Sequence, residues 1–194
     1  QHQQQHLKPL LVAQAKDAEG RLYDLESVVV NFADVGMSYA KSVLDKSSRQ
    51  GGIHDFDWEG VRRCVRYIRA EREMKIFGVI PEDFQAQDSG SGHRCGLPFD
   101  IQLMCECVEE VLPYPLSGQE GAAREMTVER AYERNCLYVD SGSGAAPLVC
   151  HARCRAWLDK CRDLVHLRYF FDTTLGTFDV FDGNVGTPAL ARMN

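Results

Sequence analysis

The sequence predicts an α/β fold, a three-layer α/β/α, Rossmann-like domain with a mostly parallel central sheet and a C-terminal hairpin. Short β-branched runs alternate with amphipathic segments along the chain, and the run SVVVN at residues 27–31 is apolar enough for a strand buried on both faces. Two aromatic-rich runs flank residues 173–176, as in a hairpin. Strands separated by helices form right-handed βαβ units, which place helices on both faces of a parallel sheet.

Apolar runs and amphipathic periods predict the individual elements. The expected strands are residues 27–31, 75–80, 111–114 and 137–139. The expected helices are residues 57–69, a helix capped by Asp100 that carries Ile101, Met104, Cys105 and Val108 on one face, and residues 126–134 and 148–167. Phe99 is placed to staple onto Met104 in the second of these helices. The Gly- and Ser-rich residues 85–96 are expected to form a loop.

The composition is that of a chain with one domain. The 194 residues are 44% hydrophobic, enough for a core without disulfide staples. We expect a flexible N-terminal tail over residues 1–26, which begins QHQQQH, a domain over residues 27–182 and a C-terminal tail over residues 183–194. The first residue is Gln1 rather than Met, which indicates a fragment of a longer protein.

Charge and hydropathy exclude two classes of partner. Lys and Arg total 22 against 28 Asp and Glu, and the net charge of −6 excludes a generic polybasic nucleic-acid coat. Every apolar run is far shorter than the roughly 20 residues of a membrane helix, so we expect no membrane contact. We also find no signal peptide and expect an intracellular location, in the cytoplasm.

Eight cysteines allow three interpretations: disulfides, zinc ligands or free thiols. We expect mostly free thiols, because the chain lacks an export signal and several cysteines lie on apolar faces of expected helices. Zinc is the alternative. Its candidate ligands are His93, Cys95, Cys105 and Cys107 in one cluster, and Cys150, His151 and Cys154 in another. Cys105 and Cys107 would lie about 200° apart on a helix, which disfavours the first cluster.

Ligands in this architecture bind beyond the carboxyl ends of the strands. The residues that follow the expected strands are 31–34, 81–83, 115–124 and 140–143. Functional side chains are therefore expected in these four segments.

Three segments, in order and spacing, resemble PIN-like ribonuclease domains of the NYN type, and most closely the Regnase branch. They are VVVNFADVGMS (28–38), DIQLMCECVEEVLPYPLSG (100–118) and VERAYERNCLYVDSG (128–142), and residues 153–180 resemble the family's closing helix and hairpin. The resemblance covers roughly residues 27–182. It implies a PIN-like fold and an endoribonuclease that holds Mg²⁺ or Mn²⁺ with Asp side chains at the strand ends. Such ions require charged oxygen ligands, activate water and offset charge on the phosphate.

The sequence departs from the family at the catalytic positions. Where the family has metal-binding Asp residues, this chain has Asn31, Ala123, Arg124, Gly142 and Ala146. Asp34 stands where the family has Asn. An Arg124 guanidinium would repel a divalent cation, although a slip of one or two residues would bring in Glu125 and Asp140.

The leading hypothesis is a catalytically degenerate PIN/NYN-like domain, a pseudo-nuclease without a cofactor. Its degenerate pocket comprises Asn31, Asp34, Arg124, Asp140 and Gly142. It would act as an interaction module in RNA processing or decay, binding a protein subunit of such a complex, RNA or a second copy. The alternative is a Mg²⁺- or Mn²⁺-dependent endoribonuclease with a rearranged set of carboxylates: Asp34, Glu125 and Asp140.

Three features near these segments have both a functional and a structural interpretation. Asp34 with Asn31 could form a residual metal site, or Asp34 could cap a helical turn at residues 35–40. The run Asp140-Ser-Gly-Ser-Gly could cradle a phosphate or be an ordinary connection. Arg62, Arg66 and Arg69 fall at i, i+4 and i+7, which predicts a stripe that binds RNA or a partner, or a solvated face balanced by the chain's own acidic residues.

Overall fold

The computed structural model describes residues 15–45, 56–82, 97–112, 118–142 and 150–181. In this part of the chain five strands form a sheet in the order β3-β2-β1-β4-β5, with every neighbouring pair parallel, and two further strands form an antiparallel hairpin. The elements are β1 (Asp24–Asn31), α2 (Phe32–Ser42), α3 (Trp58–Glu71), β2 (Lys75–Pro81), α4 (Phe99–Met104), β3 (Cys107–Val111), α5 (Gly118–Arg134), β4 (Cys136–Val139), α6 (Ala152–Val165), β5 (His166–Leu167), β6 (Tyr169–Phe171) and β7 (Phe178–Val180).

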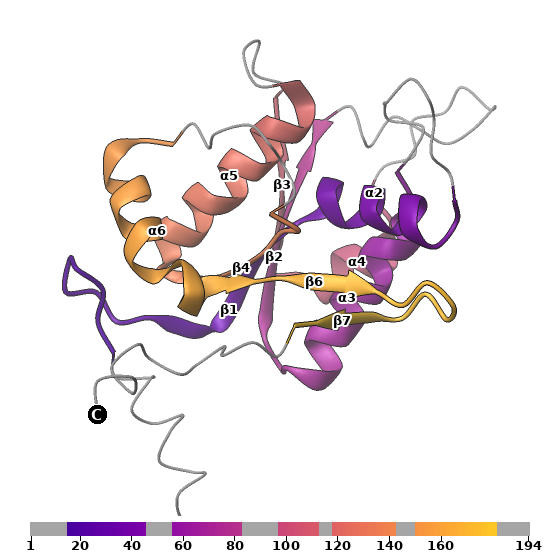
Figure 1. Cartoon of the computed structure of the whole chain (residues 1–194), viewed down its shortest axis with the longest axis horizontal. Coiled ribbons are helices and arrows are strands. Elements are labelled where there is room, and N and C mark those ends of the chain that lie inside the picture. Colours follow the sequence, from indigo (N-terminus) through magenta and orange to yellow (C-terminus); the bar gives the residue numbers. More distant parts are fainter. Residues whose placement is uncertain (1–14, 46–55, 83–96, 113–117, 143–149, 182–194) are drawn as a thin grey trace, which may run out of the picture.

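Helices cover both faces of the sheet, with α2, α3 and α4 on one side and α5 and α6 on the other (Figure 1). Strand β1 shows why, because its side chains alternate between the two faces. Val28 and Val30 pack with α2 and α3, whereas Val29 packs with α5 and α6, and all three are fully buried. The predicted three-layer α/β architecture with a C-terminal hairpin is confirmed, and its central sheet is entirely parallel.

The β6–β7 hairpin packs on α2 and α3, as a layer added to that side of the molecule (Figure 1). Edge-to-face ring contacts join it to both helices, Phe171 to Tyr39 with centroids 5.1 Å apart and Phe178 to Tyr67 at 5.4 Å. Arg63 of α3 also donates a hydrogen bond of 2.6 Å to the carbonyl oxygen of Gly176 in the turn. The chain thus returns from the sheet edge at β5 to the helices that follow β1.

The region around α4 differs from the sequence-based expectation. The helix ends at Met104, so Cys105 and Val108 do not lie on one helical face with Ile101, and Cys107 and Val108 belong to strand β3. Pro98, not Asp100, is the N-cap, and Phe99 is exposed rather than stapled. A short apolar run fits both periods, and here the pairing of β3 with β2 decides the outcome.

The ordered region extends N-terminal to the expected domain boundary at residue 27. Strand β1 begins at Asp24, and the preceding segment is held by Asn135, which donates to the carbonyl oxygens of Arg21 and Leu22. Trp157 of α6 donates to the Asn135 side-chain oxygen at 2.7 Å. Asn135 adopts a left-handed φ of 53° where α5 ends, a conformation that Asn tolerates. The expected tails at residues 1–14 and 183–194, and the expected loop at residues 85–96, lie outside the described residues.

The other helices and strands follow the prediction, with shifted ends. Helix α5 begins eight residues before the expected start at Met126, whereas α6 is shorter than the expected 148–167. Only a helical turn was expected at residues 35–40, and the structure has a full helix there, α2. Among the helices of the described residues, none has the length and apolarity needed to span a lipid bilayer.

Candidate functional site

The candidate site lies where the order of the sheet reverses. From β1 the chain steps outward to β2 and β3, and then returns to place β4 and β5 on the other side of β1. The region beyond the carboxyl ends of β1 and β4 is therefore the topological switch point, the usual place of the ligand in an open parallel sheet. Asn31 ends β1, and Asp140 directly follows β4.

Asp140 is buried at this switch point and is surrounded by donors. The Asn31 side-chain amide donates to Asp140 Oδ2 at 3.0 Å, and the backbone N–H of Gly142 donates to Oδ1 at 2.7 Å. Arg124 Nε lies 3.6 Å from Oδ1. Asp140 is only 3% exposed, so these groups of the chain replace the water that a carboxylate otherwise requires.

Asp34 lies beside Asp140 and is also saturated with donors. Ser141 donates through its hydroxyl to Asp34 Oδ1 at 2.6 Å and through its backbone N–H to Oδ2 at 2.7 Å. The Tyr169 hydroxyl of β6 donates to Oδ2 at 2.7 Å. Burial raises the pKa of Asp34, the negative charge of Asp140 raises it further, and the hydrogen bonds from Ser141 and Tyr169 oppose both effects.

Asn31 serves both the helix and the carboxylates, which corrects the expectation that Asp34 caps this helix. The Asn31 side-chain oxygen accepts the backbone N–H of Asp34 at 3.2 Å, as the N-cap of α2, while its amide N–H donates to Asp140. The amide carries both the acceptor and the donor that these two roles need, whereas a carboxylate offers only acceptors. An Asp at this position could cap the helix, but it would face the Asp140 carboxylate with no proton to donate.

All five residues of the expected degenerate pocket converge here: Asn31, Asp34, Arg124, Asp140 and Gly142. Glu125, the third carboxylate of the alternative metal site, is on α5 next to Arg124. Within the described ranges, no three His, Cys, Asp or Glu side chains gather in a way that could hold a metal ion. Ala146 lies outside these ranges.

The residues present do not fit a Mg²⁺ or Mn²⁺ ion. Such an ion is bound by about six oxygen ligands, with carboxylate oxygens directed at it. Here the oxygens of Asp34 and Asp140 face five hydrogen-bond donors of the chain, and a guanidinium group lies within 4 Å of Asp140. A cation at this point would have to displace those donors and would be repelled by Arg124.

The loop after β4 does not present its first amides to a phosphate. The backbone N–H of Ser141 donates a hydrogen bond to Asp34, and that of Gly142 donates one to Asp140, so both amides are used by the chain's own carboxylates. Gly142 adopts a φ of +68°, a conformation that few other residues tolerate, and this allows its N–H to turn back toward Asp140. The remaining glycine and serine of the expected phosphate cradle lie outside the described residues.

Sequence reasoning missed two side chains at this site, Tyr169 and His166, and it did not foresee that Ser141, in the expected segment 140–143, donates to Asp34. His166 Nε2 lies 2.8 Å from the Asp140 carbonyl oxygen, and because a carbonyl only accepts, this nitrogen carries the proton. The His166 ring stacks on Tyr138 with centroids 4.6 Å apart. Burial lowers the pKa of His166. The hydrogen bond to the Asp140 carbonyl oxygen and the Asp140 charge oppose this effect, and the charges of Arg162 and Arg168 add to it.

The expected arginine stripe on α3 is only partly open to a partner. Arg62 forms a salt bridge of 2.8 Å with Glu59 and a second one with Asp100, so the chain's own acidic residues neutralise it. Arg66 and Arg69 are exposed and, among the described residues, form no ion pair. The charge of Arg62, the first member of the stripe, is therefore balanced by acidic residues of the same chain.

The described cysteines bear on the zinc hypothesis. Seven of the described cysteines are free thiols: Cys64, Cys105, Cys107, Cys136, Cys150, Cys154 and Cys161. His151 Nδ1 accepts the backbone N–H of Cys154 as the N-cap of α6, so this histidine has a structural role. Cys105 and Cys107 lie at the end of α4 and the start of β3 rather than on one helix, and His93 and Cys95 lie outside the described residues.

No protein-family model matches this chain, and no curated protein matches it either. The PIN/NYN resemblance therefore rests on the sequence motifs quoted above. A three-layer α/β fold supports many unrelated activities, so function has to be argued from the site itself.

Proposed function

We propose that this chain is a catalytically degenerate PIN/NYN-like domain that binds a partner in RNA processing or decay instead of cleaving RNA. The observation that carries the proposal is the closed pair of carboxylates at the switch point. Asp34 and Asp140 are in the place where a nuclease of this fold would hold its metal, yet their oxygens accept five hydrogen bonds from the chain.

Hydrogen bonds to charged groups make this closed state costly to open. Each contributes about 1.5–3 kcal/mol, and an unsatisfied buried donor adds a penalty of its own. A metal ion would have to offset the loss of several such bonds and the repulsion from Arg124 before it could activate a water molecule. The chain thus stabilises its two carboxylates without a cation.

The proposed role is that of an interaction module inside the cell, in the cytoplasm. The partner is a protein subunit of an RNA-processing or decay complex, RNA, or a second copy of this chain. Free thiols at seven described cysteines support a reducing compartment. The motifs around Asn31, Arg124 and Asp140 connect the chain to RNA metabolism through the resemblance.

A second candidate function is a metal-dependent endoribonuclease, because two carboxylates do lie side by side at the switch point. The burial and mutual repulsion that raise the pKa of Asp34 would also favour a cation between Asp34 and Asp140. This function requires Ser141 and Tyr169 to release Asp34, and it requires Arg124 to move away from Asp140.

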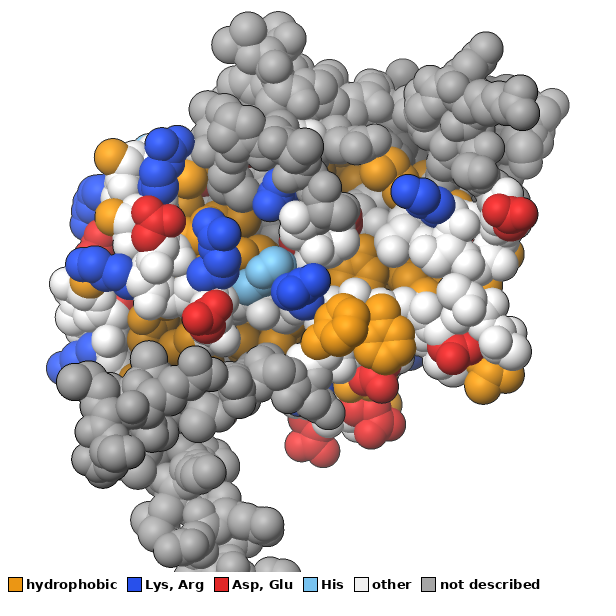
Figure 2. Space-filling model, viewed as in Figure 1, with side chains coloured by type: hydrophobic (Ala, Val, Ile, Leu, Met, Phe, Trp, Pro, Cys, Tyr) orange, Lys and Arg blue, Asp and Glu red, His pale blue; other side chains and the backbone are white. Residues whose placement is uncertain are grey.

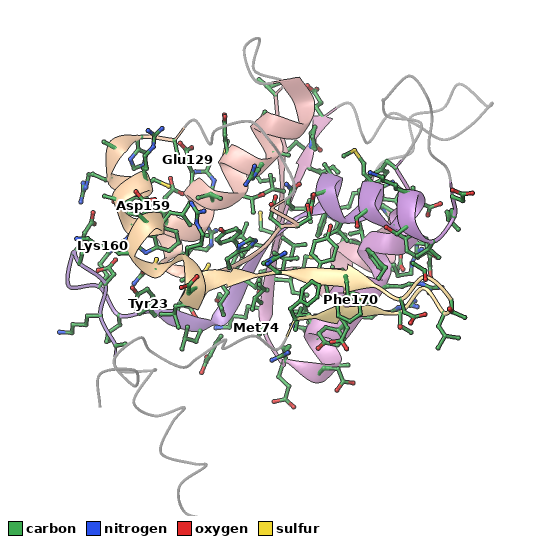
Figure 3. The ribbon with its side chains drawn as sticks, in the orientation of Figure 1. Tyr23, Met74, Glu129, Asp159, Lys160 and Phe170 are labelled. Atoms are coloured by element: carbon green, nitrogen blue, oxygen red, sulfur yellow. The ribbon has the colours of Figure 1, made fainter. Side chains whose placement is uncertain are left out.

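The test is an RNA-cleavage assay on the full chain with labelled single-stranded RNA in Mg²⁺, in Mn²⁺ and in EDTA. We expect equal, background cleavage in all three. The proposal is wrong if metal-dependent cleavage is lost in Asp34→Asn and kept in Asp159→Asn, a matched change on the exposed side of α6 (Figure 3).

A further inference from the structure

We propose that the outer face of the β6–β7 hairpin, together with the cationic side chains beside it, binds single-stranded RNA. This surface, which we call the arginine–aromatic surface, consists of Arg162, His166, Arg168, Phe170 and Phe181. The inference rests on the proposed function, since it names the partner of a domain that binds without cleaving. It concerns a surface distinct from the arginine stripe on α3 and from the carboxylates of Asp34 and Asp140, and it adjoins that pair at His166, whose ring donates to the Asp140 carbonyl oxygen.

The hairpin is aromatic on both of its faces, although folding requires only one. Tyr169, Phe171, Phe178 and Val180 are buried against the helices. The outward side chains of Phe170 and Phe181 are 40% and 49% exposed, and their rings lie together with centroids 4.9 Å apart. Figure 3 shows Phe170 over the outer side of β6. The core does not need these two rings, and exposed apolar side chains that lie together on a surface can serve as a contact site.

One cationic group, the Arg168 guanidinium, lies directly beside this aromatic pair. The Arg168 guanidinium carbon is 5.5 Å from the centroid of the Phe181 ring. Arg162 and Arg168 are both exposed, and their positive charges add to the effect of burial in lowering the pKa of His166. Figure 2 shows Lys or Arg side chains and a His side chain adjoining a pair of exposed hydrophobic side chains on this side of the molecule.

Rings next to guanidinium groups match the chemistry of a single strand. Unpaired bases stack on aromatic side chains, while arginines neutralise the neighbouring phosphates. Double-stranded nucleic acid buries its base faces, so it cannot use the rings. The whole chain carries a net charge of −6. Guanidinium groups also lie near four other rings of the described residues, those of Tyr39, Tyr67, Phe77 and Tyr132, but these rings are buried or half-buried, whereas the Phe181 ring is exposed.

Arginines elsewhere on the chain are engaged differently. On α3, Arg62 is held by Glu59 and Asp100, while Arg63 donates to Glu59 and to the carbonyl oxygens of Leu175 and Gly176. Arg66 and Arg69 are exposed on the same helix without exposed aromatic rings stacked beside them among the contacts of the described residues. These two residues provide a matched control for a purely electrostatic effect.

The experiment measures RNA binding by the full chain with fluorescence anisotropy, in EDTA, using a fluorescein-labelled single-stranded oligoadenylate of about ten nucleotides. Four double variants are compared: Phe170→Leu with Phe181→Leu, Phe170→Tyr with Phe181→Tyr, Arg162→Ala with Arg168→Ala, and Arg66→Ala with Arg69→Ala. The Leu pair keeps apolar area and loses the stacking faces, whereas the Tyr pair keeps both. Circular dichroism confirms that each variant is folded.

We expect the Leu pair to weaken binding by about 10- to 100-fold, and the Tyr pair to bind within about threefold of wild type. The Arg162 and Arg168 pair should weaken binding and reduce the slope of log K against log salt by about 1.4, or about 0.7 for each phosphate contact. The Arg66 and Arg69 pair should leave both quantities unchanged. A duplex of the same length should not compete.

The inference is overturned if wild type does not bind the oligonucleotide, if the Leu pair binds as wild type does, or if the α3 control loses as much affinity as the Arg162 and Arg168 pair. Absence of binding together with background cleavage would leave a protein partner for the proposed function. Metal-dependent cleavage that requires Asp34 would instead contradict the proposed function itself, so the two failures are distinguishable.

Discussion

Two regions of the molecule use their charges in opposite ways. The Asp34–Asp140 pair is closed, because Asn31, Ser141, Gly142 and Tyr169 donate to it from within the fold. The arginine–aromatic surface is open, with its arginines and both phenylalanines exposed to solvent. On the proposed account, the place where this fold usually binds its ligand is given over to stability, and recognition takes place on a neighbouring surface.

The largest expected effect is on the closed pair. Asp34→Ala removes three hydrogen bonds and leaves the donors of Ser141 and Tyr169 without an acceptor. We expect the free energy of unfolding to fall by about 3 kcal/mol, measured by urea denaturation at neutral pH. The control Asp159→Ala, on the exposed side of α6, should change it by less than about 0.5 kcal/mol. Equal effects of the two variants would mean that Asp34 is not part of a closed network.

A second variant tests the match between Asn31 and Asp140. Asn31→Asp keeps the helix cap but places an acceptor against the Asp140 carboxylate, where the amide now donates at 3.0 Å. We expect a loss of about 2 kcal/mol in the free energy of unfolding at neutral pH. The loss should shrink under mildly acidic conditions, because a proton shared by the two carboxylates restores the hydrogen bond. A loss that is independent of pH would contradict this account.

The pH dependence of stability sharpens the comparison further. Burial and the charge of Asp140 raise the pKa of Asp34 in the folded state above its value in the unfolded chain. The folded state therefore binds the proton more tightly, and this group stabilises the fold most below its unfolded pKa. Its contribution is lost as the pH rises through the folded pKa. Urea denaturation across mildly acidic pH measures the free energy of unfolding of wild type and of Asp34→Asn. We expect only wild type to show the pH-dependent contribution of Asp34. Curves of this free energy against pH that run parallel for the two proteins would contradict it.

The smallest expected effect is on the stability of the open surface. The pair Arg162→Ala and Arg168→Ala should change the free energy of unfolding by about 0.5 kcal/mol or less, since both side chains are exposed. The same pair is expected to weaken RNA binding, so stability and binding should separate at this surface. Thermal denaturation, followed by circular dichroism, measures the first quantity. A large loss of stability would show that these arginines hold the fold together.

The sequence allowed the fold and much of the site to be predicted for identifiable reasons. Three consecutive buried valines mark β1 as a central strand, and the rule that ligands bind at strand ends pointed to Asn31, Asp34 and Asp140. Tyr169 could not be found in this way. It reaches Asp34 only because the hairpin folds back from the sheet edge over α2, and no local pattern encodes that path.

Long-range pairing also explains the other differences. The arginine stripe has the periodicity of one helix, but the neutralisation of Arg62 depends on Asp100, which is 38 residues away in the sequence. The apolar run around Cys107 and Val108 suits a helix or a strand equally well, and its place beside β2 decides for a strand. Periodicity describes one element at a time, whereas these outcomes are set by the neighbouring element.

The central claim is that the Asp34–Asp140 pair is closed to divalent cations, and direct titration of the full chain with Mn²⁺ tests it. Free Mn²⁺ is followed by electron paramagnetic resonance at neutral pH, with wild type, Asp34→Asn and the control Asp159→Asn measured side by side. We predict the same Mn²⁺ signal for all three proteins, because the donors of Asn31, Ser141, Gly142 and Tyr169 occupy the carboxylates. Stoichiometric binding by wild type that disappears in Asp34→Asn and persists in Asp159→Asn would contradict the account.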